Sequence, residues 1–167
     1  MTKIFRKRIE GDINMAENQY VVFKLNNEEF GIDIMNVKEI IPYQESTQIP
    51  NSPDFIEGVI NYRGNVIPII NLNKRFKLNV NEITGDTRII VISLGEKEVG
   101  FIVDEASQTI RLEKEQIDPT PDIISDVDRR YIIGVGKVDE SRLLILLDLE
   151  KILSNKEIEV IETLEIH

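Results

Sequence analysis

The sequence contains no cysteine, which excludes disulfide bonds, catalytic thiolates and thiolate metal ligands. Its single histidine is the last residue, His167, and side chains at chain ends are usually frayed rather than functional. Most nucleophilic and zinc chemistry therefore lacks its usual residues. We expect no metal and no cofactor.

The sequence also lacks a membrane signal. No apolar run approaches the ~20 residues that span a bilayer, and no long apolar region follows the basic N-terminal stretch, so we do not interpret it as a signal peptide. The net charge is −10, which opposes binding to nucleic acid, because that affinity comes from lysine and arginine at phosphates. We expect neither nucleic-acid binding nor insertion into a membrane.

Motifs of common enzymes are missing as well. The sequence has no HExxH, GxxxxGK[ST], GxGxxG or GxSxG. Carboxylates are abundant, so an acid-using hydrolase with Asp33 or Asp104 remains an alternative. Nothing in the pattern places two carboxylates in one apolar pocket, which favours a solvated acidic face.

Short β-prone segments are what the sequence does contain. YVVFKL and TRIIVISL are typical of them, and turns rich in Gly, Asn and Pro separate such runs. Many short strands favour an all-β fold of small barrels. Near the end, Ile158 and Ile161 have helical spacing and Ser154 is an N-cap candidate, which predicts a short helix within 152–167.

Two pairs of segments resemble each other. VVFKLNNEEFGIDI matches IVISLGEKEVGFIV, and IEGVINYRGNVIPIINL matches IIGVGKVDESRLLILLDL. This duplication predicts two similar β-barrels, approximately 18–82 and 83–150, whose strands may cross between them. Five glycines in these segments are expected to be structural, because glycine permits positive φ and a close backbone approach: Gly31, Gly58, Gly64, Gly100 and Gly134.

Two places leave the choice between structure and binding open. Val37 either packs inward or lies at the rim of a groove, and the core is favoured. Arg63 stands beside Gly64 at the turn of EGVINYRGNVIPIINL, where it is either a solvated side chain or an interface anchor. The matching turn of the second copy has no Arg-Gly, so the fold itself does not require this pair.

Four blocks of the sequence resemble the CheW family, the coupling proteins of bacterial chemotaxis. They are EEFGIDIMNVKEI, FIEGVINYRGNVIPIINLNKRF, EVGFIVDEASQTI and YIIGVGKVDESRLLILLDLEKIL, and the resemblance extends over 18–155. It implies two SH3-like, five-stranded barrels around a shared core, between a flexible tail at 1–17 and the C-terminal helix. It also implies a non-catalytic cytoplasmic adaptor that is recruited to membrane-associated receptor arrays.

The resemblance implies two partners and a set of contacts for each. A chemoreceptor tip, which is a helical hairpin, would dock between the barrels, and the regulatory domain of the histidine kinase CheA would bind barrel ends. Residues matching the receptor positions are Val37, Glu39, Gly58, Arg63 and Ile89, and those matching a kinase surface are Asp118, Asp122 and Ile123.

Two departures from the family stand in the kinase loop. Some relatives carry a basic residue and an aromatic residue where this chain has Asp118 and Ile123, so the contact here is absent or differently made. A module that binds some other helix or peptide outside chemotaxis is the second alternative.

Overall fold

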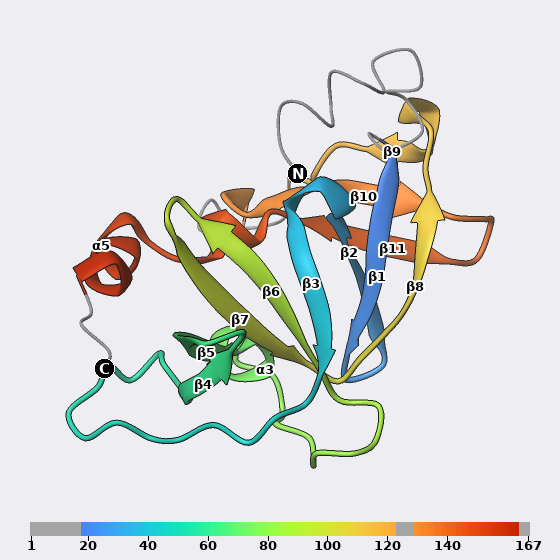
Figure 1. Cartoon of the computed structure of the whole chain (residues 1–167). Helices are drawn as coiled ribbons and strands as arrows, with labels where there is room; N and C mark the ends of the chain where they lie inside the picture. The colour runs from blue at the N-terminus through green and yellow to red at the C-terminus, as the bar shows by residue number, and fades with distance from the viewer. Residues whose placement is uncertain (1–17, 123–128, 164–167) are drawn as a thin grey trace, which may run out of the picture.

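The computed structural model describes residues 18–122 and 129–163. The tail 1–17 and Ile123 lie outside the described residues. Within the described part the fold is mainly β and consists of two sheets (Figure 1). No helix in this part is long and apolar enough to cross a membrane.

The first sheet has the strand order β8-β1-β2-β11-β10-β9. Its β2–β11 pair is parallel and its other pairs are antiparallel. It contains the five strands expected for a barrel and a two-residue strand, β9, at one edge. The strands are β1 (Gln19–Leu25), β2 (Glu28–Asp33), β8 (Glu105–Arg111), β9 (Ile117–Asp118), β10 (Ile132–Lys137) and β11 (Leu143–Leu147).

The second sheet has the order β3-β6-β7-β5-β4, and β5–β7 is its parallel pair. Its strands are β3 (Val37–Pro42), β4 (Gly58–Tyr62), β5 (Asn65–Asn71), β6 (Arg88–Leu94) and β7 (Lys97–Val103). The helices are α3 (Leu72–Arg75), α5 (Asn155–Thr163) and the 3₁₀ helices Ile34–Asn36, Lys114–Gln116 and Leu149–Ile152.

The strand orders reveal how the duplicated copies are combined. The two sheets have matching strand orders, β8-β1-β2-β11-β10 and β3-β6-β7-β5-β4. In this alignment the hairpin β1–β2 matches β6–β7, and the parallel pair β2–β11 matches β7–β5. The hairpin β1–β2 of the first copy is therefore completed by strands of the second copy, and the hairpin β6–β7 of the second copy by strands of the first. Each sheet contains strands from both 18–82 and 83–150.

The register gives the same equivalence residue by residue. Gly31 and Gly134 both pair with Leu146, one from each side. Gly100 and Gly58 both pair with Ile69 in the same way. Leu146 and Ile69 are thus equivalent positions of the two barrels.

Two glycines illustrate why no side chain fits at these crossings. A Cβ added to Gly100 would lie 2.6 Å from Cδ1 of Ile69, and one added to Gly58 would lie 2.8 Å from the carbonyl oxygen of Thr47. Both distances are shorter than van der Waals contact. Close packing of neighbouring strands therefore requires glycine at both positions.

The largest core cluster lies between the sheets and is built from both. It includes Phe23 and Leu147 from the first sheet and Ile90 and Phe101 from the second. These four side chains have at most 1% of their surface exposed. Because residues of both sheets form this cluster, the two barrels share it. Burial of apolar surface is the dominant favourable contribution to the folding free energy.

The C-terminal helix α5 begins where the sequence predicts. The Ser154 Oγ accepts a hydrogen bond from the Glu157 backbone N–H (3.1 Å), and the Glu157 carboxylate accepts one from the Ser154 N–H (2.9 Å). This is a capping box. Ile161 is 2% exposed and anchors the helix to the core.

Candidate functional site

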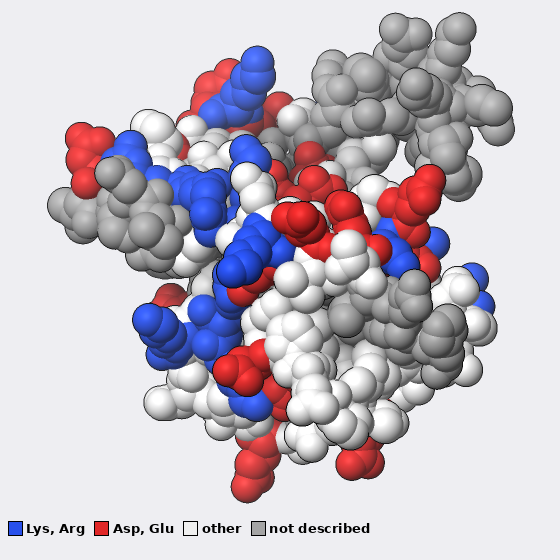
Figure 2. Space-filling view, turned by 90° about the vertical axis from the view of Figure 1, so that its left-hand side faces the viewer, with Lys and Arg blue, Asp and Glu red and all other residues white. Residues whose placement is uncertain are grey.

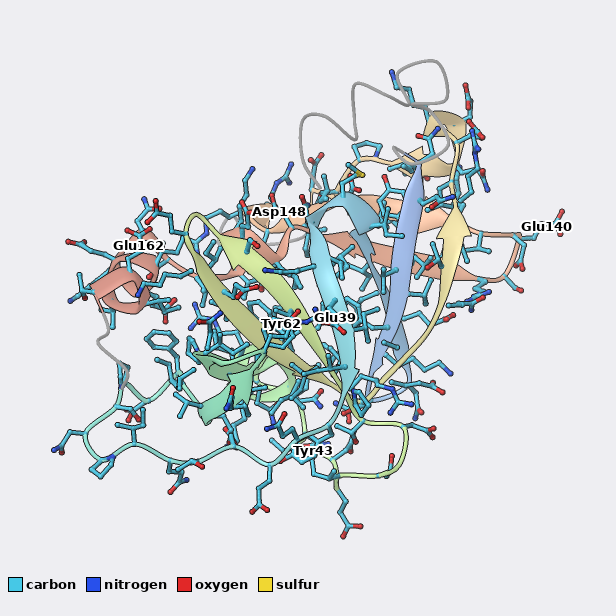
Figure 3. The ribbon with its side chains drawn as sticks, in the orientation of Figure 1. Glu39, Tyr43, Tyr62, Glu140, Asp148 and Glu162 are labelled. Atoms are coloured by element: carbon cyan, nitrogen blue, oxygen red, sulfur yellow. The ribbon has the colours of Figure 1, made fainter. Side chains whose placement is uncertain are left out.

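Glu39, Tyr62 and Arg63 form a polar cluster at the closure of the second barrel. Glu39 lies on β3 and Tyr62 ends β4, and these are the two edge strands of the sheet. The Tyr62 hydroxyl donates a hydrogen bond of 2.6 Å to Oε1 of Glu39. The sheet thus curves until its edges meet, and the two labelled side chains lie next to each other in Figure 3.

The turn after Tyr62 holds Arg63 in an uncommon backbone conformation. Arg63 has φ 50° and Gly64 has φ 84°, which is the pattern of a type I′ turn. The Asn61 side chain supports it by accepting a hydrogen bond of 3.0 Å from the Gly64 N–H. A non-glycine residue in the left-handed region costs about 1–2 kcal/mol, and such conformations concentrate at functional sites.

The Arg63 guanidinium is held in place although it is exposed. Its Nε and Nη2 lie 3.0 Å and 2.8 Å from Oε1 of Glu39. Its Cζ stands 5.6 Å from the centre of the Tyr62 ring, within the range of cation–π attraction. Because 69% of the Arg63 side chain remains exposed, the cluster presents an oriented cation to solvent.

The cluster shifts the titration of its members in opposite directions. The hydrogen bond from Tyr62, followed by that from Arg63, lowers the pKa of the Glu39 carboxyl. Burial first, and then the hydrogen bond to Glu39, raises the pKa of the Tyr62 hydroxyl. Both shifts preserve the carboxylate and the neutral phenol across the neutral pH range.

Strand β3 continues the site away from this cluster. A bulge between Val37 and Glu39 interrupts its pairing with β6, so the inward–outward alternation shifts there. Val37 is partly buried and packs against the shared core. Lys38 is exposed and forms an ion pair with Glu98 of β7.

Two of the expected receptor residues lie below the surface. Ile89 has no exposed surface and packs in the apolar cluster that also contains Tyr62. Gly58 is buried where the loop segment at Thr47 pairs with Val59. Of the expected set, Glu39 and Arg63 thus touch each other at the surface, whereas Ile89 and Gly58 lie underneath.

Of the expected kinase residues, Asp118 and Asp122 fall within the described part of the chain. Asp118 belongs to the edge strand β9, is exposed, and forms an ion pair of 3.3 Å with Lys137. Asp122 is exposed and lies 3.4 Å from Arg129. Asp118 therefore lies on a different sheet from Glu39.

The aspartates of the hydrolase hypothesis serve structural roles. Asp33 caps the 3₁₀ helix Ile34–Asn36 by accepting from the Met35 N–H at 2.9 Å. Asp104 accepts hydrogen bonds at 2.7–2.8 Å from nitrogen atoms of Asn26, Asn73 and Asn81. Across 18–122 and 129–163, no group of three or more His, Asp or Glu side chains is placed to hold a metal.

Charge is unevenly distributed on the face shown in Figure 2, which is the left-hand side of Figure 1. Lys and Arg side chains are seen from the top of this face down its left half, with Asp and Glu side chains among them (Figure 2).

Sequence reasoning did not identify Tyr62 as a member of the site. Its role depends on the meeting of β3 and β4, which are separated along the chain and do not pair in the sheet. One local pattern could have indicated that role: Tyr62 ends a strand and directly precedes the Arg63-Gly64 turn, so its polar hydroxyl lies near a cation at the surface.

Comparison with known proteins finds similarity over most of the chain. The CheW-like domain family profile matches residues 19–157. The chain is 41% identical to the chemotaxis protein CheW of Klebsiella aerogenes over 144 residues, 86% of each chain. It is 34% identical to CheW of Treponema pallidum over 165 residues, 96% of each chain. The crystal structure of the scaffolding protein TtCheW from Thermoanaerobacter tengcongensis is similar with a TM-score of 0.73 and 34% identity, covering 83% of this chain and 88% of that one.

Proposed function

Because the chain belongs to the CheW family, we propose that it is a non-catalytic chemotaxis adaptor that couples chemoreceptors to the histidine kinase CheA. It would act in the cytoplasm at membrane-associated receptor arrays. One partner would be the helical tip of a receptor and the other the regulatory domain of the kinase.

The observation that carries the receptor half of this proposal is the locked Arg63. A pre-oriented arginine loses little conformational freedom on binding, and planar bidentate contacts make arginine common at binding hot spots. The second copy has no equivalent of the Arg63-Gly64 pair in its turn. A strained residue that the fold does not need supports a role in recognition.

The kinase half is supported by the separation of the two surfaces. Asp118 lies on β9 of the first sheet, and Arg63 lies in the turn between β4 and β5 of the second. An adaptor must bind two partners without one blocking the other, and separate barrels satisfy that requirement. A helix-binding module outside chemotaxis is not favoured, because the matched relatives bear chemotaxis names.

Titration calorimetry with a receptor-tip fragment and with the kinase regulatory domain tests the proposal. Arg63→Glu should weaken receptor binding at least about tenfold, ~1.4 kcal/mol, and leave kinase binding unchanged. Arg63→Asn keeps a residue suited to the type I′ turn and should also weaken receptor binding, which separates the side chain from the turn.

Lys74→Glu is the matched control, since Lys74 is another exposed cation that pairs with a glutamate, Glu57. It should leave receptor binding intact. Normal receptor binding by Arg63→Glu would remove the anchor role, and a wild-type protein that binds neither fragment would overturn the coupling function.

A further inference from the structure

The first barrel carries an open apolar pocket of about 270 Å³. Its floor is formed by Phe30 and Leu147, which are 8% and 1% exposed. Its partly buried walls include Phe76 and Tyr131, whose rings stack at 5.4 Å. Leu78 stands at the rim with 37% of its surface exposed. Polar groups are scarce here, so the pocket suits an apolar side chain.

The duplication identifies the matching place on the second barrel. Since Leu146 and Ile69 are equivalent, the pocket residues Ile145 and Leu147 correspond to Pro68 and Ile70. The part of β11 that lines the pocket in the first barrel is thus equivalent to the part of β5 around Pro68 in the second barrel.

On the second barrel this place is covered by α5. Ile161 of α5 lines a hollow together with Pro68 and belongs to the same core cluster as Ile70. Ile158, one helical turn earlier, packs against that cluster. Ile161 therefore lies at the second barrel's version of the site, and Ile158, three residues earlier, packs against the same core cluster.

On the first barrel the corresponding segment turns away instead. Both α3 and the 3₁₀ helix Leu149–Ile152 directly follow equivalent strands, but only the latter continues into a helix that covers a barrel. After Phe76 the chain passes Lys77 with φ 60°. It is then held at the β1–β2 turn by the hydrogen bonds of Asn26 to Asn79 and of Asn81 to Asn26.

We infer that the open pocket of the first barrel binds a short amphipathic helix of a partner protein, in the way that the second barrel binds α5. Two aliphatic side chains at positions i and i+3 would enter the pocket. The helix would be acidic outside, because exposed Lys77 and Arg130 adjoin pocket residues and α5 itself carries Glu157, Glu159 and Glu162.

Helix binding at the open pocket is independent of the receptor and kinase contacts. The internal duplication supports it, and α5 is a precedent for it within the same chain. Coupling can therefore fail while the pocket binds a helix, and the reverse can also hold.

The probe is a labelled peptide of residues 153–167, titrated into the full-length chain and followed by fluorescence anisotropy. Saturable binding is expected. A peptide in which Ile158 and Ile161 are replaced by serine should bind at least about tenfold more weakly, because the apolar stripe supplies the contact. Absence of saturable binding, or equal binding of both peptides, would overturn the inference.

Variants of the full chain locate the site. Leu78→Asp places a charge at the rim and should weaken peptide binding about tenfold. Leu143→Asp is the control, because Leu143 is 56% exposed on β11 and does not line the pocket. Thermal unfolding of each variant verifies the fold.

Two outcomes would assign the peptide elsewhere. Binding that survives Leu78→Asp but is lost in Val66→Asp, beside Ile161 on the second barrel, would mean that the peptide displaces α5, and would refute the inference. Concentration-dependent dimers that Leu78→Asp abolishes, without peptide binding to the monomer, would assign the pocket to a second copy and would refute it equally.

Discussion

At the scale of single residues, Tyr62 links the core to the recognition surface. Its ring is buried with Ile89 and its hydroxyl reaches Glu39, which in turn holds Arg63. The expected receptor residue Ile89 thus supports the surface from below through Tyr62. A buried residue can influence binding in this way without touching a partner.

Tyr62→Phe should raise the pKa of Glu39 toward its ordinary value, because the Tyr62 hydrogen bond is the largest cause that lowers it. The measurement is a pH titration of the Glu39 side-chain carboxyl by ¹³C NMR. Tyr43→Phe, a tyrosine that packs against the same apolar cluster, should leave that pKa unchanged. An unchanged pKa of Glu39 in Tyr62→Phe would contradict the role of the Tyr62 hydrogen bond in lowering it.

The same substitution has a consequence for stability. A carboxyl whose folded-state pKa is lowered adds stability above its unfolded pKa, ~4.3 for glutamate, and that stability is lost as pH falls through the folded-state value. Tyr62→Phe should therefore reduce the loss of unfolding free energy between neutral and acidic pH, which urea titrations at several pH values measure.

At the scale of elements, α5 is short and depends on contacts with the rest of the chain. Nine residues are too few for a stable isolated helix. Besides the capping box and Ile161, both Arg75 guanidinium amino groups donate to the Glu157 carboxylate at 2.6–2.7 Å, and one also donates to the Ile152 carbonyl at 2.9 Å. Glu157 thus serves the cap and the ion pair at once.

Arg75→Ala should destabilise the fold by about 1–2 kcal/mol, since it removes charge-assisted hydrogen bonds from a partly buried pair. Hydrogen exchange of the amides in α5 should accelerate. Lys74→Ala, at the neighbouring and more exposed ion pair with Glu57, should cost at most about 1 kcal/mol and leave α5 unchanged. Equal exchange in α5 for both variants would show that Arg75 does not hold the helix.

The contrast between α5 and the Glu39 cluster explains what sequence could predict. The cap at Ser154 and the stripe of Ile158 and Ile161 are local patterns, so the helix was predictable from neighbouring residues. The contact of Glu39 with Tyr62 depends on barrel closure, which no local pattern specifies. The burial of Ile89 likewise follows from its place in a central strand between β3 and β7.

At the scale of the whole molecule, the hairpins were predictable but their partners were not. The match of the two copies located β1–β2 and β6–β7, because glycines and turns recur in both. Which copy completes which hairpin is a long-range choice, and β3 pairs with β6 rather than with β2. The expected halves 18–82 and 83–150 are ranges of the sequence repeat, whereas each sheet exchanges strands between the two ranges and so combines both.

The exchange predicts that neither half folds alone. Residues 18–82 contain β1 to β5, but β2 pairs across the chain with β11, and β3 and β5 with β6 and β7. Separately expressed 18–82 and 83–167 should both lack dispersed amide signals in NMR spectra, and mixing them should restore them. Cooperative unfolding of 18–82 by itself would contradict this prediction.

The order in which the strands leave the ribosome gives the exchange a further consequence. All strands of the second sheet lie between Val37 and Val103, whereas the first sheet needs both β1 and β11. At ~5–20 residues per second, the second sheet has all its strands seconds before the first. During that interval β1 and β2 wait with unpaired edges, a state prone to association with other chains. The growing chain is therefore most vulnerable at its oldest hairpin, until the last strand is made.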